Sequence, residues 1–185
     1  MVGMCIMCEG NDRDDVLFHL DAAIDRFGWV CQGVEGHDPP DLDWVYTVGL
    51  AGGFDHPELV ALGDIPSGAE VLNELGALVR SGRRLAAGER IRTSSGVVTL
   101  GRVHPDHLTG GLVAVWVDYY GSLGPPFPEP EVLQVIRPDP SCCAEHRFTL
   151  PLLSDPKAEL VRTLPPGPNR AERRAQQRAT RQRGR

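Results

Sequence analysis

The stretch "WVYTVGLAGGFDHPELVALG", residues 44–63, joins two short apolar runs through a glycine-rich connection. In the first run successive side chains leave on opposite sides of an extended chain, so Tyr46 and Val48 share one face while Val45 and Thr47 share the other. The second run, "ELVALG", has a similar length and apolar content. The stretch therefore predicts a β-hairpin with a long connection.

Two helices and several further strands are expected around this hairpin. Apolar residues recur at helical spacing in 13–27 and 67–81. In the second segment, Ser67 followed by Glu70 has the pattern of a capping box. Short runs rich in β-branched residues predict strands at 29–34, 89–93, 97–103, 112–118 and 132–137. The expected fold class is α+β, with two amphipathic helices packed on a mostly antiparallel sheet.

Charge divides the chain into two parts. The whole sequence has a net charge of -6, yet residues 165–185 contain seven arginines and one glutamate. The other 164 residues hold 12 basic and 24 acidic side chains. We therefore expect one acidic α+β domain over residues 1–164, followed by a linker rich in proline and glycine and an arginine-rich tail over 165–185.

The basic tail is a candidate binding segment. Arg170, Arg174, Arg178 and Arg181 recur at intervals of three or four residues, which would align them on one side of a helix. Like charges at this spacing repel one another in water, so we expect the isolated tail to be disordered and to become helical only against a negative partner. RNA and an acidic protein surface both fit this requirement, and a solvated extension is the alternative.

The end of the hairpin connection carries candidate chemistry. His56 and Glu58 are two residues apart, so in an extended chain their side chains leave on the same side. With Tyr46 on the facing strand, an imidazole beside a carboxylate could support general acid–base catalysis. The alternative is a well-formed turn without catalytic groups. Asp118 and Tyr119, at the end of a predicted strand, are expected to join the polar rim of any pocket.

Cysteines near both ends of the domain form a candidate zinc site. Cys5 and Cys8 make a C-x-x-C pair, and Cys142, Cys143 and His146 make C-C-x-x-H. Cys5, Cys8, one of Cys142 or Cys143, and His146 could supply the four tetrahedral ligands of a structural Zn²⁺ ion. A redox pair and inert packing are the alternatives.

The sequence favours a cytoplasmic location. The N-terminal residues lack the basic region and the long apolar run of a signal peptide. No apolar run approaches the roughly 18 residues of a membrane span, so no membrane partner is expected. The cysteines are then expected to be thiols or metal ligands rather than a disulfide framework.

Several motifs together resemble one bacterial family. They are "MCIMCEG" (4–10), "RFGWVCQGVE" (26–35), "YTVGL" with "HPELVALG" (46–63) and "VLQVIRPD" (132–139). In this order they are similar to the family called domain of unknown function 4262, over roughly residues 4–140. The resemblance implies a bacterial cytosolic protein and no particular activity. The segment "RPDPSCCAEHRF" departs from the tryptophan-containing ending that the family leads us to expect.

Two functions are consistent with these features. The first is a non-enzymatic binding or regulatory module, in which the body recognises a protein or small ligand and the tail attaches to nucleic acid or an acidic partner. The second is an enzyme of unknown class that uses Tyr46, His56 and Glu58.

Overall fold

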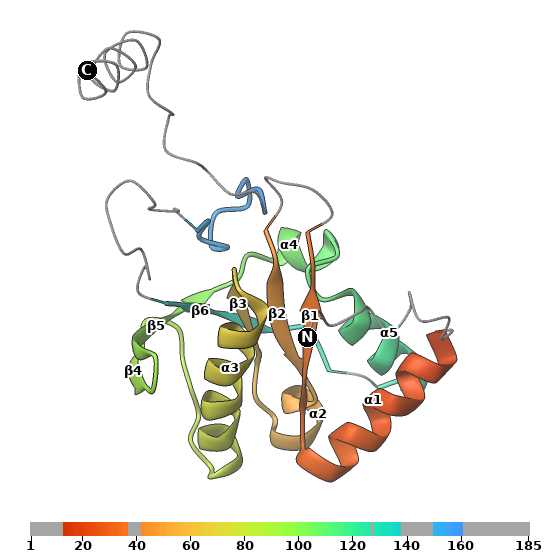
Figure 1. Ribbon diagram of the computed structural model, residues 1–185. Helices are drawn as coiled ribbons and strands as arrows, with labels where there is room; N and C mark the ends of the chain where they lie inside the picture. The colour runs from red at the N-terminus through yellow and green to blue at the C-terminus, as the bar shows by residue number, and fades with distance from the viewer. Residues whose placement is uncertain (1–12, 37–41, 127, 138–149, 161–185) are drawn as a thin grey trace, which may run out of the picture.

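The computed structural model describes residues 13–36, 42–126, 128–137 and 150–160 (Figure 1). The helices are α1 (Arg13–Phe27), α2 (Leu50–Phe54), α3 (Ile65–Arg80), α4 (Pro105–Thr109) and α5 (Ala114–Leu123). The strands are β1 (Val30–Val34), β2 (Trp44–Val48), β3 (Glu58–Leu62), β4 (Arg90–Thr93), β5 (Gly96–Arg102) and β6 (Val132–Ile136).

The six strands form one mixed sheet in the order β1-β2-β3-β6-β5-β4. Every neighbouring pair is antiparallel except β3 and β6, which run parallel. The predicted hairpin is confirmed, because β2 pairs with β3 and places Tyr46 opposite Val60. The α+β class with a mostly antiparallel sheet is confirmed as well.

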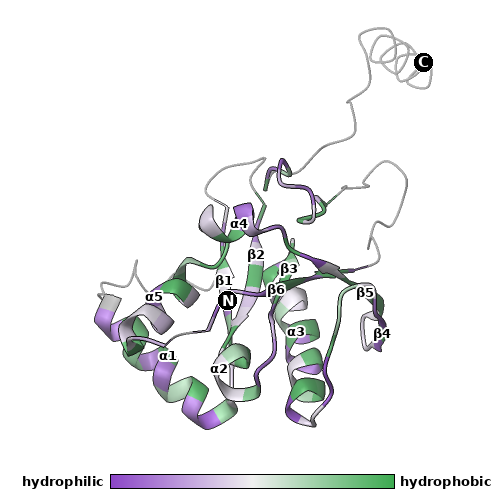
Figure 2. Cartoon of the chain, turned by 180° about the vertical axis from the view of Figure 1, so that it is seen from behind, coloured by the Kyte–Doolittle hydropathy of each residue, from purple (hydrophilic) through white to green (hydrophobic). Residues whose placement is uncertain are grey.

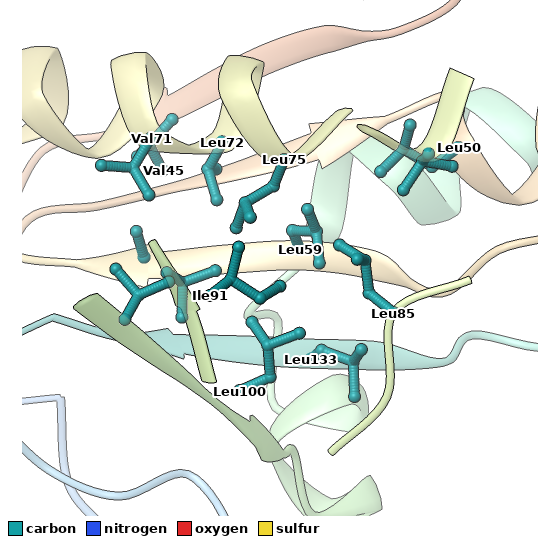
Figure 3. Close-up of a cluster of buried hydrophobic side chains, with 14 of the residues drawn as sticks. Val45, Leu50, Leu59, Val71, Leu72, Leu75, Leu85, Ile91, Leu100 and Leu133 are labelled. Carbon is teal, nitrogen blue, oxygen red and sulfur yellow. The ribbon is translucent and has the colours of Figure 1, made fainter. Parts of the chain in front are cut away.

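Each face of the sheet carries a hydrophobic core. On one face α3 packs on β1, β2 and β3, and Figure 3 shows Leu72 and Leu75 of α3 near Leu59 of β3. The other face is covered by α1, α4 and α5, with Trp116 and Tyr120 among its buried residues. The hydrophilic residues visible on α1 in Figure 2 belong to its outward side. The alternation expected in β2 is confirmed, since Tyr46 and Val48 belong to the second core and Val45 to the first.

The two predicted helices correspond to α1 and α3, but the start of α3 differs from the prediction. The N-cap is Asp64, whose carboxylate accepts a hydrogen bond of 3.0 Å from the backbone amide of Ser67. Ser67 is therefore a residue of the first turn rather than the cap. Pro66 fits there because the first helical residues need no amide donor.

The strand predicted at 112–118 is wrong. Residues 114–123 form α5, and its buried face contains Trp116, Tyr119 and Tyr120, which are spaced as on one side of a helix. The short helices α2 and α4 were not predicted either, so the described part of the chain has five helices rather than two. As a result Asp118 and Tyr119 lie on a helix and not at a strand end.

Candidate binding site at the β2–β3 connection

The connection between β2 and β3 begins at Thr47, where a side-chain hydrogen bond takes the place of backbone pairing between the two strands. The Thr47 hydroxyl oxygen accepts a hydrogen bond of 2.8 Å from the backbone amide of Leu59. The same hydroxyl donates to Oε2 of Glu58 at 2.6 Å. The side chain of Thr47 thus links β3 to the Glu58 carboxyl group.

Glu58 is the centre of a buried hydrogen-bond network. Its side chain is 1% exposed. Oε1 accepts hydrogen bonds from the backbone amides of Gly49 at 3.0 Å and Ala51 at 3.1 Å. The same oxygen accepts a longer bond of 3.3 Å from the indole nitrogen of Trp116. The carboxyl group therefore holds the start of α2 and a residue of α5 against the sheet.

Glycine is required at the entrance to this network. Gly49 has a φ of 121°, a conformation that residues with a side chain rarely adopt. A Cβ atom at this position would lie 2.8 Å from the carbonyl oxygen of Gly28. The backbone can therefore turn toward Glu58 only because residue 49 has no side chain.

Burial gives the Glu58 carboxyl group unusual proton chemistry. Removal from water raises its pKa to about 7, even though the hydrogen bonds from Thr47 and from the amides of Gly49 and Ala51 oppose the rise. The group therefore titrates near neutral pH. Among the residues that we predicted for the site, Glu58 is the one whose environment most resembles that of a functional acid or base.

Two buried tyrosines complete the surroundings of Glu58. The hydroxyl oxygen of Tyr46 accepts a hydrogen bond of 3.1 Å from the amide of Val115, and burial raises the pKa of Tyr46 well above its ordinary value. The hydroxyl oxygen of Tyr120 accepts one of 2.9 Å from the amide of Gly52, and burial raises the pKa of Tyr120 to about 12. The Tyr46 hydroxyl therefore joins β2 to α5, and the Tyr120 hydroxyl joins α5 to α2.

His56 has partners different from those of Glu58, which corrects the expected imidazole–carboxylate pair. Nε2 of His56 accepts a hydrogen bond of 2.9 Å from the amide of Leu85, so the ring proton lies on Nδ1. Nδ1 donates to the carbonyl oxygen of Pro57 at 2.7 Å. Burial, followed by the nearby charge of Arg84, lowers the pKa of His56. The imidazole is therefore neutral at pH 7 and both its nitrogens are bonded to the backbone.

Asp118 and Tyr119 lie on α5 between Trp116 and Tyr120, and the charge of Asp118 acts on Tyr46. The hydroxyl group of Tyr119 donates to Oδ1 of Asp21 at 2.9 Å and so joins α5 to α1. Burial and this carboxylate raise the pKa of Tyr119. Asp118 is half-buried on the same helix. The structure brings Tyr46 and Glu58 to the same side of the sheet, whereas Tyr119 faces α1.

Sequence reasoning missed Trp116, Tyr120 and Thr47 as members of the Glu58 network. The spacing of Trp116 and Tyr120, four residues apart, was a signal that both belong to one helical face. Apart from the glycine content of the connection, nothing in the sequence indicated that the backbone amides of Gly49 and Ala51 would donate hydrogen bonds to Glu58.

An open cleft lies beside the same connection, on the α3 side. It has a volume of about 270 Å³. Figure 1 shows α2 and the carboxyl end of α3 at the same end of the sheet, where the cleft is found. Its lining residues are Phe54, His56, Val79, Arg80, Gly82, Arg83 and Arg84.

The candidate zinc ligands Cys5, Cys8, Cys142, Cys143 and His146 lie outside the described residues. So do the tail arginines. Within the described ranges, no group of three or more His, Cys, Asp or Glu side chains is arranged to hold a metal ion.

Cys31, the cysteine that the structure describes, packs partly buried against the first core. Its burial raises the pKa of the thiol to about 12, which keeps it protonated and poorly nucleophilic at neutral pH.

The fold and the site define an α+β protein with a mixed six-stranded sheet and a buried carboxyl group beneath the β2–β3 connection. The chain belongs to the family described as domain of unknown function (DUF4262), whose sequence profile matches residues 23–143. The matched region includes the hairpin, α3 and α5, and it begins after the "MCIMCEG" motif. No curated protein and no solved structure matches the chain. No helix in the described ranges is long and apolar enough to cross a membrane.

Proposed function

We propose that this protein is a non-enzymatic binding or regulatory module of the bacterial cytoplasm. Its body recognises a protein or a small ligand, and its arginine-rich tail, residues 165–185, attaches electrostatically to nucleic acid or to an acidic partner. The tail charge of seven arginines against one glutamate supplies the attraction.

The observation that carries this proposal is the way the hairpin uses its polar side chains. Both nitrogens of His56 are bonded to backbone groups, and the Tyr46 hydroxyl oxygen accepts from the amide of Val115. Glu58 accepts from three donors on one oxygen alone. Glu58 and Tyr46 thus hold α2 and α5 in place and His56 holds the chain after α3, which favours a scaffold role. Next to them lies an open cleft lined by arginines and by apolar residues, and such a surface is suited to binding.

An enzyme that uses Glu58 is the second candidate. The pKa of about 7 favours it, because an acid or base that titrates near the working pH transfers protons most effectively. With 1% of the Glu58 side chain exposed, however, a substrate would first have to displace α2 or α5. Binding therefore requires less rearrangement than catalysis.

The role of the tail can be tested by fluorescence anisotropy with the full chain. The tail variant replaces Arg170, Arg174, Arg178 and Arg181 by glutamine. Labelled single-stranded RNA and a labelled polyglutamate peptide are the probes. For RNA, the slope of log affinity against log salt should fall by about 3 when four phosphate contacts are lost. A variant with Arg90→Gln and Arg92→Gln, both exposed on β4, is the control for loss of positive charge outside the tail.

Each probe gives a clear outcome. Retention of one probe by the wild type, and its loss in the tail variant but not in the control, supports the proposal and identifies the partner class. If the tail variant binds both probes with unchanged affinity and unchanged salt dependence, the proposed role of the tail is wrong.

A further inference from the structure

We propose that the cleft at the carboxyl end of α3 binds a small organic oxyanion carrying an apolar group, which replaces Asp55 as the partner of Arg84. This inference rests on the proposed function, because it names the ligand class that the body recognises. The oxyanion can be a carboxylate or a phosphate, since both present paired oxygens to a guanidinium group.

Three arginines are collected at this cleft by the way α3 ends. The helix stops after Arg80, and Gly82 turns the chain with a φ of 93°. This turn brings Arg83 and Arg84, which follow the helix, to the same cleft as Arg80 in its last turn. All three residues are exposed, so their side chains are not part of the packing of either hydrophobic core.

The partner of Arg84 is easily exchanged. Nη1 of Arg84 lies 3.2 Å from Oδ2 of Asp55, and the two side chains are 70% and 97% exposed. Ion pairs that are this exposed to water contribute little interaction free energy. The guanidinium group has five N–H donors, and one of them makes this contact. An incoming oxyanion can therefore take the place of the Asp55 carboxylate without breaking a buried contact.

Arg80 is held in place for ligand binding by contacts that leave its charge available. Its guanidinium group lies 5.0 Å from the centre of the Trp29 ring, and one nitrogen donates to the carbonyl oxygen of Phe27 at 3.4 Å. Stacking on an aromatic ring fixes the plane of the guanidinium without neutralising it. Arg83 instead bonds to Glu89, which is partly buried. Arg80 and Arg84 are thus the two arginines best placed to meet a ligand.

The remaining lining explains why the ligand needs an apolar group. Phe54 and Val79 are apolar, and His56 is a neutral imidazole whose nitrogens are both bonded elsewhere. The last carbonyl groups of α3 also bring partial negative charge to this end of the helix, which weakens attraction for a bare inorganic anion. A volume of about 270 Å³ has room for a ligand built around one ring.

The test uses phenyl phosphate, benzoate, inorganic phosphate and phenol as probes of the full chain at low ionic strength. Backbone amide NMR spectra follow each titration. We expect phenyl phosphate and benzoate to shift the amide signals of residues 54–56 and 80–85. Inorganic phosphate and phenol should bind at least tenfold more weakly, because each lacks one half of the ligand.

Substitutions of the ion pair should act in opposite directions. Arg84→Gln should weaken phenyl phosphate binding by about tenfold or more, because a charge-assisted bond is lost. Asp55→Asn should strengthen binding by up to about fivefold, because the competing carboxylate is removed. Asparagine is the matched substitution, since Asp55 has a φ of 50° and asparagine tolerates this conformation. Arg90→Gln is the control and should change nothing.

Three outcomes would overturn the inference. One is unchanged affinity in both Arg84→Gln and Asp55→Asn. Another is tighter binding of inorganic phosphate than of phenyl phosphate. The third is a loss of probe binding in the tail variant with no loss in Arg84→Gln, which would place the anion on the tail. The first two leave the proposed role of the tail intact, so failure of the two proposals can be told apart.

Discussion

Replacement of Glu58 by glutamine should change how the stability of the protein depends on pH. The folded protein raises the pKa of this carboxyl group from 4.5 to about 7, mainly by burial. Each pKa unit corresponds to about 1.4 kcal/mol, so the whole shift corresponds to about 3 kcal/mol of folding free energy. This figure is a substantial part of the stability of an ordinary domain.

The sign follows from which state holds the proton. Between about pH 4.5 and pH 7 the unfolded chain has lost the Glu58 proton while the folded protein keeps it. The contribution of protonated Glu58 to stability is therefore complete below about pH 4.5. It is lost as the pH rises toward 7, and above that the ionised group remains as a cost.

Glutamine is neutral at every pH and keeps a carbonyl oxygen for the amides of Gly49 and Ala51. Its NH₂ group replaces the oxygen that accepts from the Thr47 hydroxyl, so that hydroxyl proton loses its acceptor on residue 58 and the variant carries a cost that does not depend on pH. Relative to the wild type, the variant should therefore gain about 2–3 kcal/mol of unfolding free energy between pH 5 and pH 8.

Urea unfolding followed by circular dichroism at pH 5, 6, 7 and 8 measures this difference. Comparison of variant with wild type cancels the titration of all other groups. Glu70→Gln, on the exposed side of α3, is the matched control and should follow the wild-type curve. If the stability difference between Glu58→Gln and the wild type is constant from pH 5 to pH 8, the account of the buried carboxyl group is refuted.

Further predictions concern packing and the Trp116 donor. Gly76→Ala should cost about 1–3 kcal/mol in urea unfolding, because its Cβ atom would lie 2.5 Å from the Trp29 ring. Gly121→Ala, in open space on α5, should instead stabilise by about 0.5–1 kcal/mol, and equal effects of the two substitutions would contradict the packing. Trp116→Phe should lower stability by about 1–3 kcal/mol at pH 8 and by less at pH 5, where a protonated Glu58 needs the donor less. A pH-independent loss would mean that only packing was removed.

The hairpin was predictable because its information is local. Tyr46 and Val48 alternate with Val45 and Thr47, and a change of register by one residue would reverse both faces of β2. The helices α1 and α3 were predictable for the same reason, since their apolar residues repeat at helical spacing over four turns. Local periodicity therefore accounts for the parts of the fold that were predicted correctly.

The error at residues 112–118 shows where local information is insufficient. In "LVAVWVD" the valines favour a strand, and the run is short enough to fit either structure. What selects a helix is the burial of Trp116, Tyr119 and Tyr120 together on one side, against the second core. Two of these residues lie beyond the run, so the helical face becomes visible only when the segment is extended to Leu123.

The candidate site was predictable in its location and not in its chemistry. Glu58 and His56 were selected because they end the connection, yet a glutamate at the start of a strand is normally exposed. Its burial depends on α5, which lies about sixty residues away in the chain and was predicted as a strand. The backbone donors depend on the turn at Gly49, which has no side chain to indicate a partner.

The short helix α2 connects the two features of this site. Five residues are too few for a helix to be stable alone, so the position of α2 depends on its anchors. At its amino end these anchors are the hydrogen bonds from Gly49 and Ala51 to Glu58, on the side that faces α5. At its carboxyl end the chain supplies Phe54 to the cleft and Asp55 to Arg84, on the side of α3. The glycine-rich connection is therefore both a structural turn and a wall of the cleft. The contacts that hold the amino end of α2 fix the positions of Phe54 and Asp55 at its carboxyl end.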